Sequence, residues 1–276
     1  MRFIKLVYKL TCKLGLNNPN HKLFKPLLDS DIMTEKYPLV IGVGGLLEQE
    51  ESGRIQEMLQ TMKDKGCIVY APRFRTICRD GNTIMCPVNG AWVEDISLVV
   101  KEALRDPRVD ADKVGFIASS LGATYVDEFL ASNDFLTKNQ KPYVAIVPFA
   151  RPHEGIRPHV QRMIAGKVDL DVSFPHDRER GITRIIPSRC LQTVLDIDIP
   201  KILSNKSTPY QINPLTIIGI KDDRCDNNAT RKRHKILDGR PENLIELDYG
   251  HSIPQEAIQE RILQFMYSGL GFNQSS

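Results

Sequence analysis

Short apolar runs alternate with amphipathic segments from residue 37 onward, and this alternation organises most of the chain. Six apolar runs are short enough to be strands, at 38–43, 66–71, 114–117, 143–147, 215–220 and 244–247. Between them, apolar residues recur at helical spacing over 55–62, over 92–104 and after residue 120. Strands that alternate with helices are typical of a mostly parallel sheet with helices on both faces. We therefore predict an α/β fold.

The stretch 151–213 interrupts this alternation. It is rich in arginine, proline and histidine and lies between the fourth and fifth predicted strands. We predict an insertion, or cap, over one end of the sheet. It would hold a hairpin of 168–174 with 181–187 and short helices at 191–195 and 199–203. Its arginines are interpreted as solvated surface groups, with recognition of an anionic substrate group as the alternative.

The first 28 residues form a separate basic arm. They carry six lysine or arginine residues and no acidic residue, and their apolar residues fall on one helical face. We favour a helix packed on the domain over a membrane-surface helix or an organelle-targeting segment. The predicted organisation is an arm at 1–28 and a domain at 29–276 that contains the cap 151–213.

Composition narrows the classes of function. The chain has 276 residues, of which 41% are hydrophobic and 26% charged, and its net charge of +3 gives no argument for nucleic-acid binding. Its six cysteines form no C-x-x-C pair, and Cys67 in an apolar run is interpreted as a reduced core thiol. No secretory signal is evident and no apolar run is long enough to span a bilayer. We predict a cytoplasmic protein, with organelle targeting or a membrane surface as the alternative.

No motif indicates a cofactor or a metal ion. The glycines of 42–45 begin a pattern like a dinucleotide fingerprint, but no G-x-G-x-x-G is completed. A P-loop and the H-E-x-x-H pattern are likewise missing from the sequence. We expect neither a cofactor nor a metal.

The segment 113–124 predicts a sharp turn from a buried strand into a helix, with a serine at the turn. Such an elbow forces the serine into a strained backbone conformation and exposes its hydroxyl above the sheet. The residues two before and two after this serine must be small because strand and helix approach closely. Ser120 satisfies this rule through Ala118 and Gly122, whereas Ser119 would place Leu121 at the crowded position. Ser120 is therefore the candidate nucleophile.

Two further polar groups follow predicted strands, where ligands of parallel sheets bind. His251 follows the sixth strand and comes directly after Gly250, which would let its loop approach the serine. It is the candidate general base. Asp222 and Asp223 follow the fifth strand, and either carboxylate would orient this histidine. We favour Asp222 and keep Asp223 as the alternative acid.

Acyl transfer also needs two hydrogen-bond donors for the oxyanion of the tetrahedral intermediate. The glycine-rich turn after the first strand brings backbone amides to the same edge of the sheet. We assign the two donors to the backbone amides of Gly45 and Leu121, the second being the residue after the nucleophile.

The order Ser120, Asp222, His251, each after a strand, resembles the α/β-hydrolase superfamily. The segment 106–116 leading into the elbow is similar to the dienelactone-hydrolase and prolyl-oligopeptidase-like branches. Two departures stand out: Ala118 replaces the first glycine of the usual G-x-S-x-G, and Val43 replaces the customary histidine after the first strand. The resemblance implies a serine hydrolase that acts on an ester, thioester or amide through an acyl-enzyme.

Three functions are carried forward. The leading one is hydrolysis of a small-molecule carboxylic ester or thioester, with the cap shaping the substrate pocket. An acyltransferase with the same three residues differs only in the acceptor. A non-catalytic, membrane-associated binding module would instead use the basic arm 1–28 for peripheral membrane contact. No obligate protein partner is inferred.

Overall fold

The computed structural model describes residues 35–45, 54–72, 74, 77–79, 82–84, 90–133, 141–171, 183–206, 210 and 212–272. The predicted arm 1–28 lies outside the described residues.

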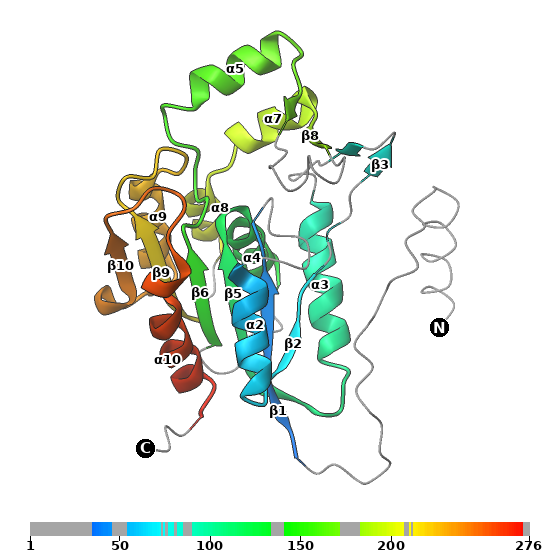
Figure 1. Ribbon diagram of the computed structural model, residues 1–276, viewed down its shortest axis with the longest axis vertical. Helices are drawn as coiled ribbons and strands as arrows, with labels where there is room; N and C mark the ends of the chain where they lie inside the picture. The colour runs from blue at the N-terminus through cyan, green and yellow to red at the C-terminus, as the bar shows by residue number, and fades with distance from the viewer. Residues whose placement is uncertain are drawn as a thin grey trace.

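A sheet of six parallel strands forms the centre of the molecule (Figure 1), as the alternating pattern predicts. The strand order is β10-β9-β6-β5-β1-β2, and every neighbouring pair is parallel. The strands are β1 (Tyr37–Val43), β2 (Ile68–Tyr70), β5 (Val109–Ser119), β6 (Lys141–Ile146), β9 (Ile212–Gly219) and β10 (Leu244–Leu247). Strand β5 begins five residues before the apolar run 114–117 that predicted it. The additional residues belong to the strand because Val109 already pairs with Tyr37 of β1, and the register of this pairing then shifts between Pro38 and Leu39.

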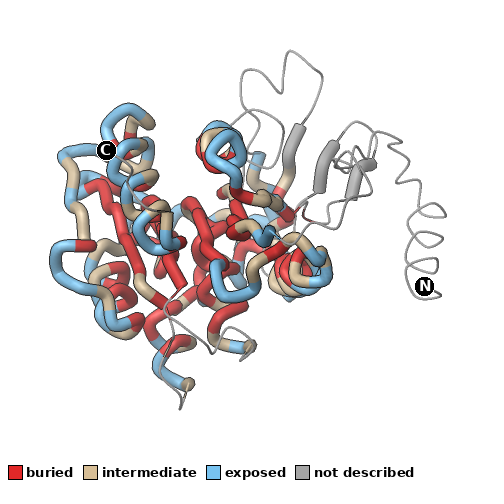
Figure 2. The backbone as a smooth tube through the Cα atoms, turned by 90° about the horizontal axis from the view of Figure 1, so that it is seen from below, coloured by how far each residue is buried: buried red, intermediate tan, exposed pale blue. Residues whose placement is uncertain are grey.

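Helices cover both faces of this sheet. Successive strand residues point to opposite faces, so Val40, Ile117 and Val144 pack on one side while Leu39, Phe116 and Tyr143 pack on the other. The first face is covered by α2 (Arg54–Asp64) and α10 (Gln259–Gly269), the second by α3 (Ala91–Ala103), α4 (Ser120–Ser132), α8 (Ile199–Ser204) and α9 (Asn227–Ile236). Short 3-10 helices η1 (Pro241–Asn243) and η2 (Gln255–Ala257) flank β10. The central strands are consequently buried, whereas the edge strands β2 and β10 are half-buried and the outer helix surfaces are exposed (Figure 2).

Part of the stretch predicted as the insertion lies beyond the carboxyl ends of the strands (Figure 1). It contains α5 (Arg157–Ala165), β7 (Leu170–Asp171), β8 (Thr183–Ile186) and α7 (Ser188–Leu195), and α8 follows it. The expected hairpin is confirmed as the antiparallel pair β7–β8, and the two expected short helices are α7 and α8. A hairpin from earlier in the chain, β3 (Ile77–Arg79) and β4 (Asn82–Ile84), joins β8 to form a second sheet of order β3-β4-β8-β7. Neither this hairpin nor α5 was predicted.

The two ends of the insertion meet at one point. The Ile199 N–H donates to the carbonyl of Ala150 at 2.9 Å, and Arg151 Nη2 lies 2.8 Å from Asp198 Oδ2. The chain therefore leaves and re-enters the main domain at a single place, which we call the insertion base (residues 150–151 and 198–199).

A fully buried ion pair joins α4 to α9. Arg233 contacts both carboxylate oxygens of Asp127, at 2.6 and 2.7 Å, and neither side chain is exposed to solvent. A third guanidinium contact reaches Thr216 Oγ1 at 3.2 Å, and the guanidinium also lies 5.0 Å from the ring centroid of Tyr143. Coulombic attraction and these hydrogen bonds compensate the large cost of burying both charges.

The described cysteines differ in chemical state. Cys67 and Cys225 are buried free thiols. The free thiol of Cys67 was expected, and its burial raises its pKa to about 12. Cys190 in α7 is disulfide-bonded. Disulfides are rare in reducing compartments, so the predicted cytoplasmic location stays a prediction and this bond weighs against it. Among the helices of the described segments, none has the length and apolar character to cross a membrane.

Candidate active site

Ser120 lies at a sharp turn between β5 and α4, with the backbone that the elbow pattern predicts. Its φ is 47°, in the left-handed region that non-glycine residues rarely occupy. A Cβ on Gly122 would lie 2.3 Å from the Val43 carbonyl oxygen and 2.4 Å from that of Gly44. Only glycine fits this approach of α4 to the end of β1, so the crowding expected at this position is present.

A chain of hydrogen bonds runs from Ser120 through His251 to Asp222. Ser120 Oγ lies 3.0 Å from His251 Nε2, and His251 Nδ1 lies 2.8 Å from Asp222 Oδ2. The His251 side chain is 14% exposed and that of Asp222 is 1% exposed. The structure therefore brings together the three residues predicted from the sequence. Asp223 is exposed and is not the carboxylate that contacts the imidazole.

His251 and two backbone amides together hold Asp222 in its ionised form. Its Oδ1 accepts from the N–H groups of Arg224 at 2.8 Å and Cys225 at 3.2 Å, which leaves Oδ2 for His251. Burial by itself raises the pKa of this carboxyl, but the hydrogen bond and charge of His251, together with the two backbone bonds, lower the pKa below its ordinary value. A buried carboxylate is thus available to accept a hydrogen bond from the Nδ1–H group of His251.

The close approach of β9 to the loop carrying His251 depends on Gly219. A Cβ there would lie 2.2 Å from the Gly250 carbonyl oxygen and 2.5 Å from that of Tyr249. At Gly250 itself, the nearest atom to an added Cβ is the Lys221 carbonyl oxygen at 3.7 Å. The sequence interpretation that Gly250 allows the approach is therefore wrong. The crowded glycine is at the end of the neighbouring strand, a position that becomes recognisable only from the pairing of the two strands.

The two predicted oxyanion amides differ in their surroundings. Leu121 lies in the first turn of α4, where backbone N–H groups have no acceptor within the helix. The Gly45 N–H donates to Ser119 Oγ at 3.0 Å. A Cβ on Gly45 would lie 3.1 Å from that of Ser120, so this turn passes directly beside the candidate nucleophile. Ser119, rejected as nucleophile, thus contacts the turn after β1.

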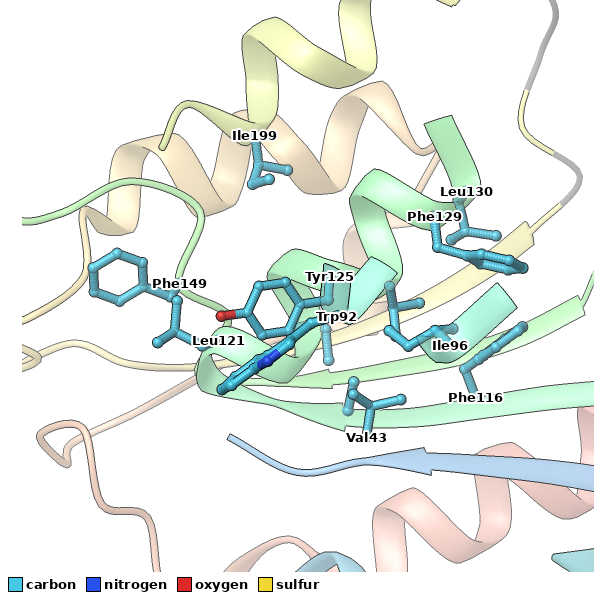
Figure 3. Close-up of a cluster of buried hydrophobic side chains, with 14 of the residues drawn as sticks. Val43, Trp92, Ile96, Phe116, Leu121, Tyr125, Phe129, Leu130, Phe149 and Ile199 are labelled. Carbon is cyan, nitrogen blue, oxygen red and sulfur yellow. The ribbon is translucent and has the colours of Figure 1, made fainter. Parts of the chain in front are cut away.

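Apolar and aromatic side chains surround the beginning of α4. Trp92 stacks on Phe74 at 4.5 Å between ring centroids and meets Tyr125 edge-on at 5.0 Å. Figure 3 shows Leu121 and Phe149 on the same side of this cluster as the Tyr125 hydroxyl. The Phe149 N–H donates to the Ser120 carbonyl at 3.2 Å. The helix that begins at Ser120 therefore packs its first turns into a mostly apolar cluster.

The loop that carries Asp222 is paired with the start of the insertion. Pro152 forms an isolated β-bridge with Cys225, and the His153 N–H donates to the Arg224 carbonyl at 2.8 Å. Asp226 N–H donates to the Arg151 carbonyl at 2.9 Å. This pairing also places Cys225 Sγ at 3.5 Å from His251 Nδ1. Sequence reasoning missed Cys225, because nothing in the local pattern indicates that the turn after Asp222 directs a thiol back toward the histidine.

Comparison with known proteins gives a clear result at the level of the fold only. No family model matches the chain, and no curated protein matches it by sequence. Among solved structures, the α/β hydrolase GrgF from Penicillium sp. sh18 superimposes with a TM-score of 0.61 over 87% of this chain and 92% of that one, at 14% identity. The chain has the α/β-hydrolase fold.

Two further solved structures share this fold. Est1E from Butyrivibrio proteoclasticus, determined with bound ferulic acid, matches with a TM-score of 0.57 at 16% identity and covers 86% of this chain and 90% of its own. A monoacylglycerol lipase from Paleococcus ferrophilus matches with a TM-score of 0.56 at 15% identity over 85% and 97% of the two chains. The narrower similarity to the dienelactone-hydrolase and prolyl-oligopeptidase-like branches stays a prediction.

Proposed function

We propose that this protein is a serine hydrolase that cleaves a small-molecule carboxylic ester or thioester through an acyl-enzyme. The observation that carries the proposal is the hydrogen-bond chain from Ser120 Oγ through His251 to Asp222, at 3.0 and 2.8 Å, at an elbow with positive φ. A nucleophile, a base and a buried carboxylate at these distances form a complete set for acyl transfer.

Each residue has one role in the proposed reaction. His251 Nε2 removes the proton of Ser120 as Oγ attacks the substrate carbonyl, and Asp222 stabilises the resulting imidazolium. His251 then protonates the leaving alcohol or thiol, so that the acyl group stays on Ser120. A water molecule deprotonated by the same Nε2 attacks the acyl-enzyme and releases the carboxylic acid.

The oxyanion formed in both steps needs donors beside Ser120. The N-terminal amide of α4 at Leu121 supplies one, and the amide of Gly45 supplies the other. Because the Gly45 N–H donates to Ser119 Oγ in the free protein, we propose that Ser119 orients this amide until substrate binds. The insertion acts as the cap that shapes the substrate pocket.

Two observations support an ester with an apolar acyl or alcohol group. The side chains packed around the first turns of α4, which begins at Ser120, are largely aromatic or aliphatic. Proteins of the same fold include Est1E, determined with ferulic acid, and a monoacylglycerol lipase. The choice between ester and thioester rests on the substrate test below.

A fluorophosphonate probe, which reacts with activated serines, tests the proposal. We expect labelling of the native protein and its loss in Ser120→Ala. The matched control is Ser132→Ala at the other end of α4, whose hydroxyl donates to the Glu128 carbonyl; this variant should label normally. Absence of labelling in the folded native protein would contradict the enzyme proposal and favour the binding-module alternative.

A substrate panel then resolves the reaction. Nitrophenyl esters and acyl-CoA thioesters of increasing acyl length measure the preferred leaving group and acyl chain. Addition of alcohol acceptors distinguishes hydrolysis from acyl transfer, because a transferase would form the new ester faster than the free acid.

A further inference from the structure

Cys225 is a buried thiol beside the candidate triad to which the proposed reaction gives no role. Its Sγ lies 3.5 Å from His251 Nδ1, which itself lies 2.8 Å from Asp222 Oδ2. One sulfur, one nitrogen and one oxygen ligand atom thus lie within 4.8 Å of one another. This set combines the three ligand types that bind zinc in proteins.

The backbone fixes the position of this thiol. The Cys225 N–H donates to Asp222 Oδ1 at 3.2 Å, and the residue forms a β-bridge with Pro152. The side chain is therefore held against the Nδ1 side of the imidazole. Nε2, on the other side of the ring, contacts Ser120.

The spacing of these atoms approaches that of a tetrahedral zinc site. Zn–S and Zn–N bonds of about 2.3 and 2.0 Å place the sulfur and nitrogen about 3.5 Å apart at a tetrahedral angle. The Sγ to Nδ1 distance here is 3.5 Å. The nitrogen and oxygen of such a site would be about 3.3 Å apart, whereas His251 Nδ1 and Asp222 Oδ2 are 2.8 Å apart. The ion must therefore separate His251 from Asp222 by roughly half an ångström.

We propose that Asp222, Cys225 and His251 form a binding site for Zn²⁺ or a chemically similar divalent cation, and that occupation of this site switches the enzyme off. The ion displaces the Cys225 thiol proton, which passes to solvent, and it takes the place of the His251 Nδ1 proton, which moves to Nε2 of the same ring. Water completes the fourth coordination position.

Inhibition follows from the tautomer of the imidazole. With a metal ion on Nδ1, a neutral ring carries its remaining proton on Nε2. Nε2 then donates toward Ser120 and no longer accepts its proton, and Asp222 is occupied by the ion. The inhibitory effect rests on the proposed function, whereas binding of the metal ion does not.

The same surroundings exclude other uses of Cys225. Cys225 is only 1% exposed to solvent. A buried thiol is poorly accessible to oxidants or electrophiles, which disfavours a redox sensor. Mg²⁺ and Ca²⁺ prefer oxygen ligands, so the nitrogen and sulfur donors select a softer ion that displaces the thiol proton.

Binding is tested with Co²⁺, which reports a thiolate ligand through a charge-transfer absorption band. Untagged full-length protein should bind one Co²⁺ ion with this band, and Zn²⁺ should displace it. Cys225→Ala should abolish the band and weaken Zn²⁺ binding at least about tenfold. Cys225→Ser repeats the measurement with nearly the same side-chain volume. Cys67→Ala, which removes another buried free thiol, should behave as the native protein. A band that persists in both Cys225 variants would overturn the site.

Inhibition is tested by fluorophosphonate labelling with and without Zn²⁺. The native protein should lose labelling as Zn²⁺ is added, whereas Cys225→Ala, compared with its own metal-free labelling rate, should resist Zn²⁺. Cobalt binding without protection of Ser120 would overturn the inhibitory role. If the native protein never labels, the proposed function fails, while the cobalt measurement still decides whether the site exists.

Discussion

Replacement of Asp222 by asparagine tests the proposed site most sharply, because the surrounding hydrogen bonds fix the orientation of the new amide. Oδ1 of Asp222 accepts two backbone N–H groups, from Arg224 and Cys225. The oxygen of the introduced amide must take this place, since its NH₂ group would oppose two donors. The NH₂ group therefore faces His251 Nδ1 in place of an acceptor.

This orientation reverses the imidazole tautomer. An NH₂ donor at 2.8 Å requires an unprotonated Nδ1, so the ring proton moves to Nε2 and points at Ser120 Oγ. The base is lost although the shape of the site is conserved. A wrong tautomer of this kind lowers kcat by about 10⁴-fold in a serine protease, which corresponds to about 5 kcal/mol of transition-state stabilisation.

The matched control is Asp223→Asn. Asp223 neighbours Asp222 in the chain but is exposed, so its variant should keep kcat/KM within about twofold of the native value because exposed charges contribute little. The assay is ester hydrolysis under saturating and limiting substrate, with fluorophosphonate labelling rates as a second measurement. Equal losses in the two variants, or an Asp222→Asn enzyme with more than a tenth of native kcat, would refute the proposed role of Asp222.

Three further predictions concern stability. Gly122→Ala should lower the free energy of unfolding by about 3 kcal/mol, because the new methyl group meets backbone oxygens at the end of β1. The Tm measured by calorimetry should fall by roughly 6–12 °C, and an unchanged Tm would contradict the crowding at this position. Asp127→Asn should cost about 4 kcal/mol in urea unfolding by leaving Arg233 buried without its counter-charge, and the double variant Asp127→Leu with Arg233→Met should recover most of this loss. Burial and the charge of Asp127 raise the pKa of Glu128 from 4.5 to about 7. The folded state therefore disfavours ionised Glu128, so stability should fall as pH rises through this window, by about 3 kcal/mol in total. Glu128→Gln should remove that fall, and an unaltered pH profile would argue against it.

The sequence predicts the central sheet well because its strands are buried on both faces. The run 143–147 is apolar throughout and is bounded by Pro142 and Pro148, so its composition and length leave few alternatives. The elbow is predictable for a different reason. Its steric rule refers only to neighbours of Ser120 in the chain, namely Ala118 and Gly122.

Features that depend on contacts between distant segments were not predictable. The hairpin β3–β4 has strands of three residues and becomes part of a sheet only through β8, about one hundred residues later. Helix α5 fully buries only Val160, and its apolar residues Met163 and Ile164 are only partly buried, so the apolar stripe that marks a packed helix is short. The roles of Gly219 and Cys225 depend on how β9 and β10 lie side by side and on the turn that follows β9.

The insertion base has a consequence for how this protein can diversify. Because Ala150 and Ile199 are hydrogen-bonded and Arg151 pairs with Asp198, the segment between them is a closed excursion from the main domain. Its length and internal structure can vary while the two chain ends keep the same separation. A segment from another protein, joined after His153 and before Asp198, would keep the pairing of Pro152 and His153 with the loop that carries Asp222. It would also have to supply a partner strand for β4 in place of β8.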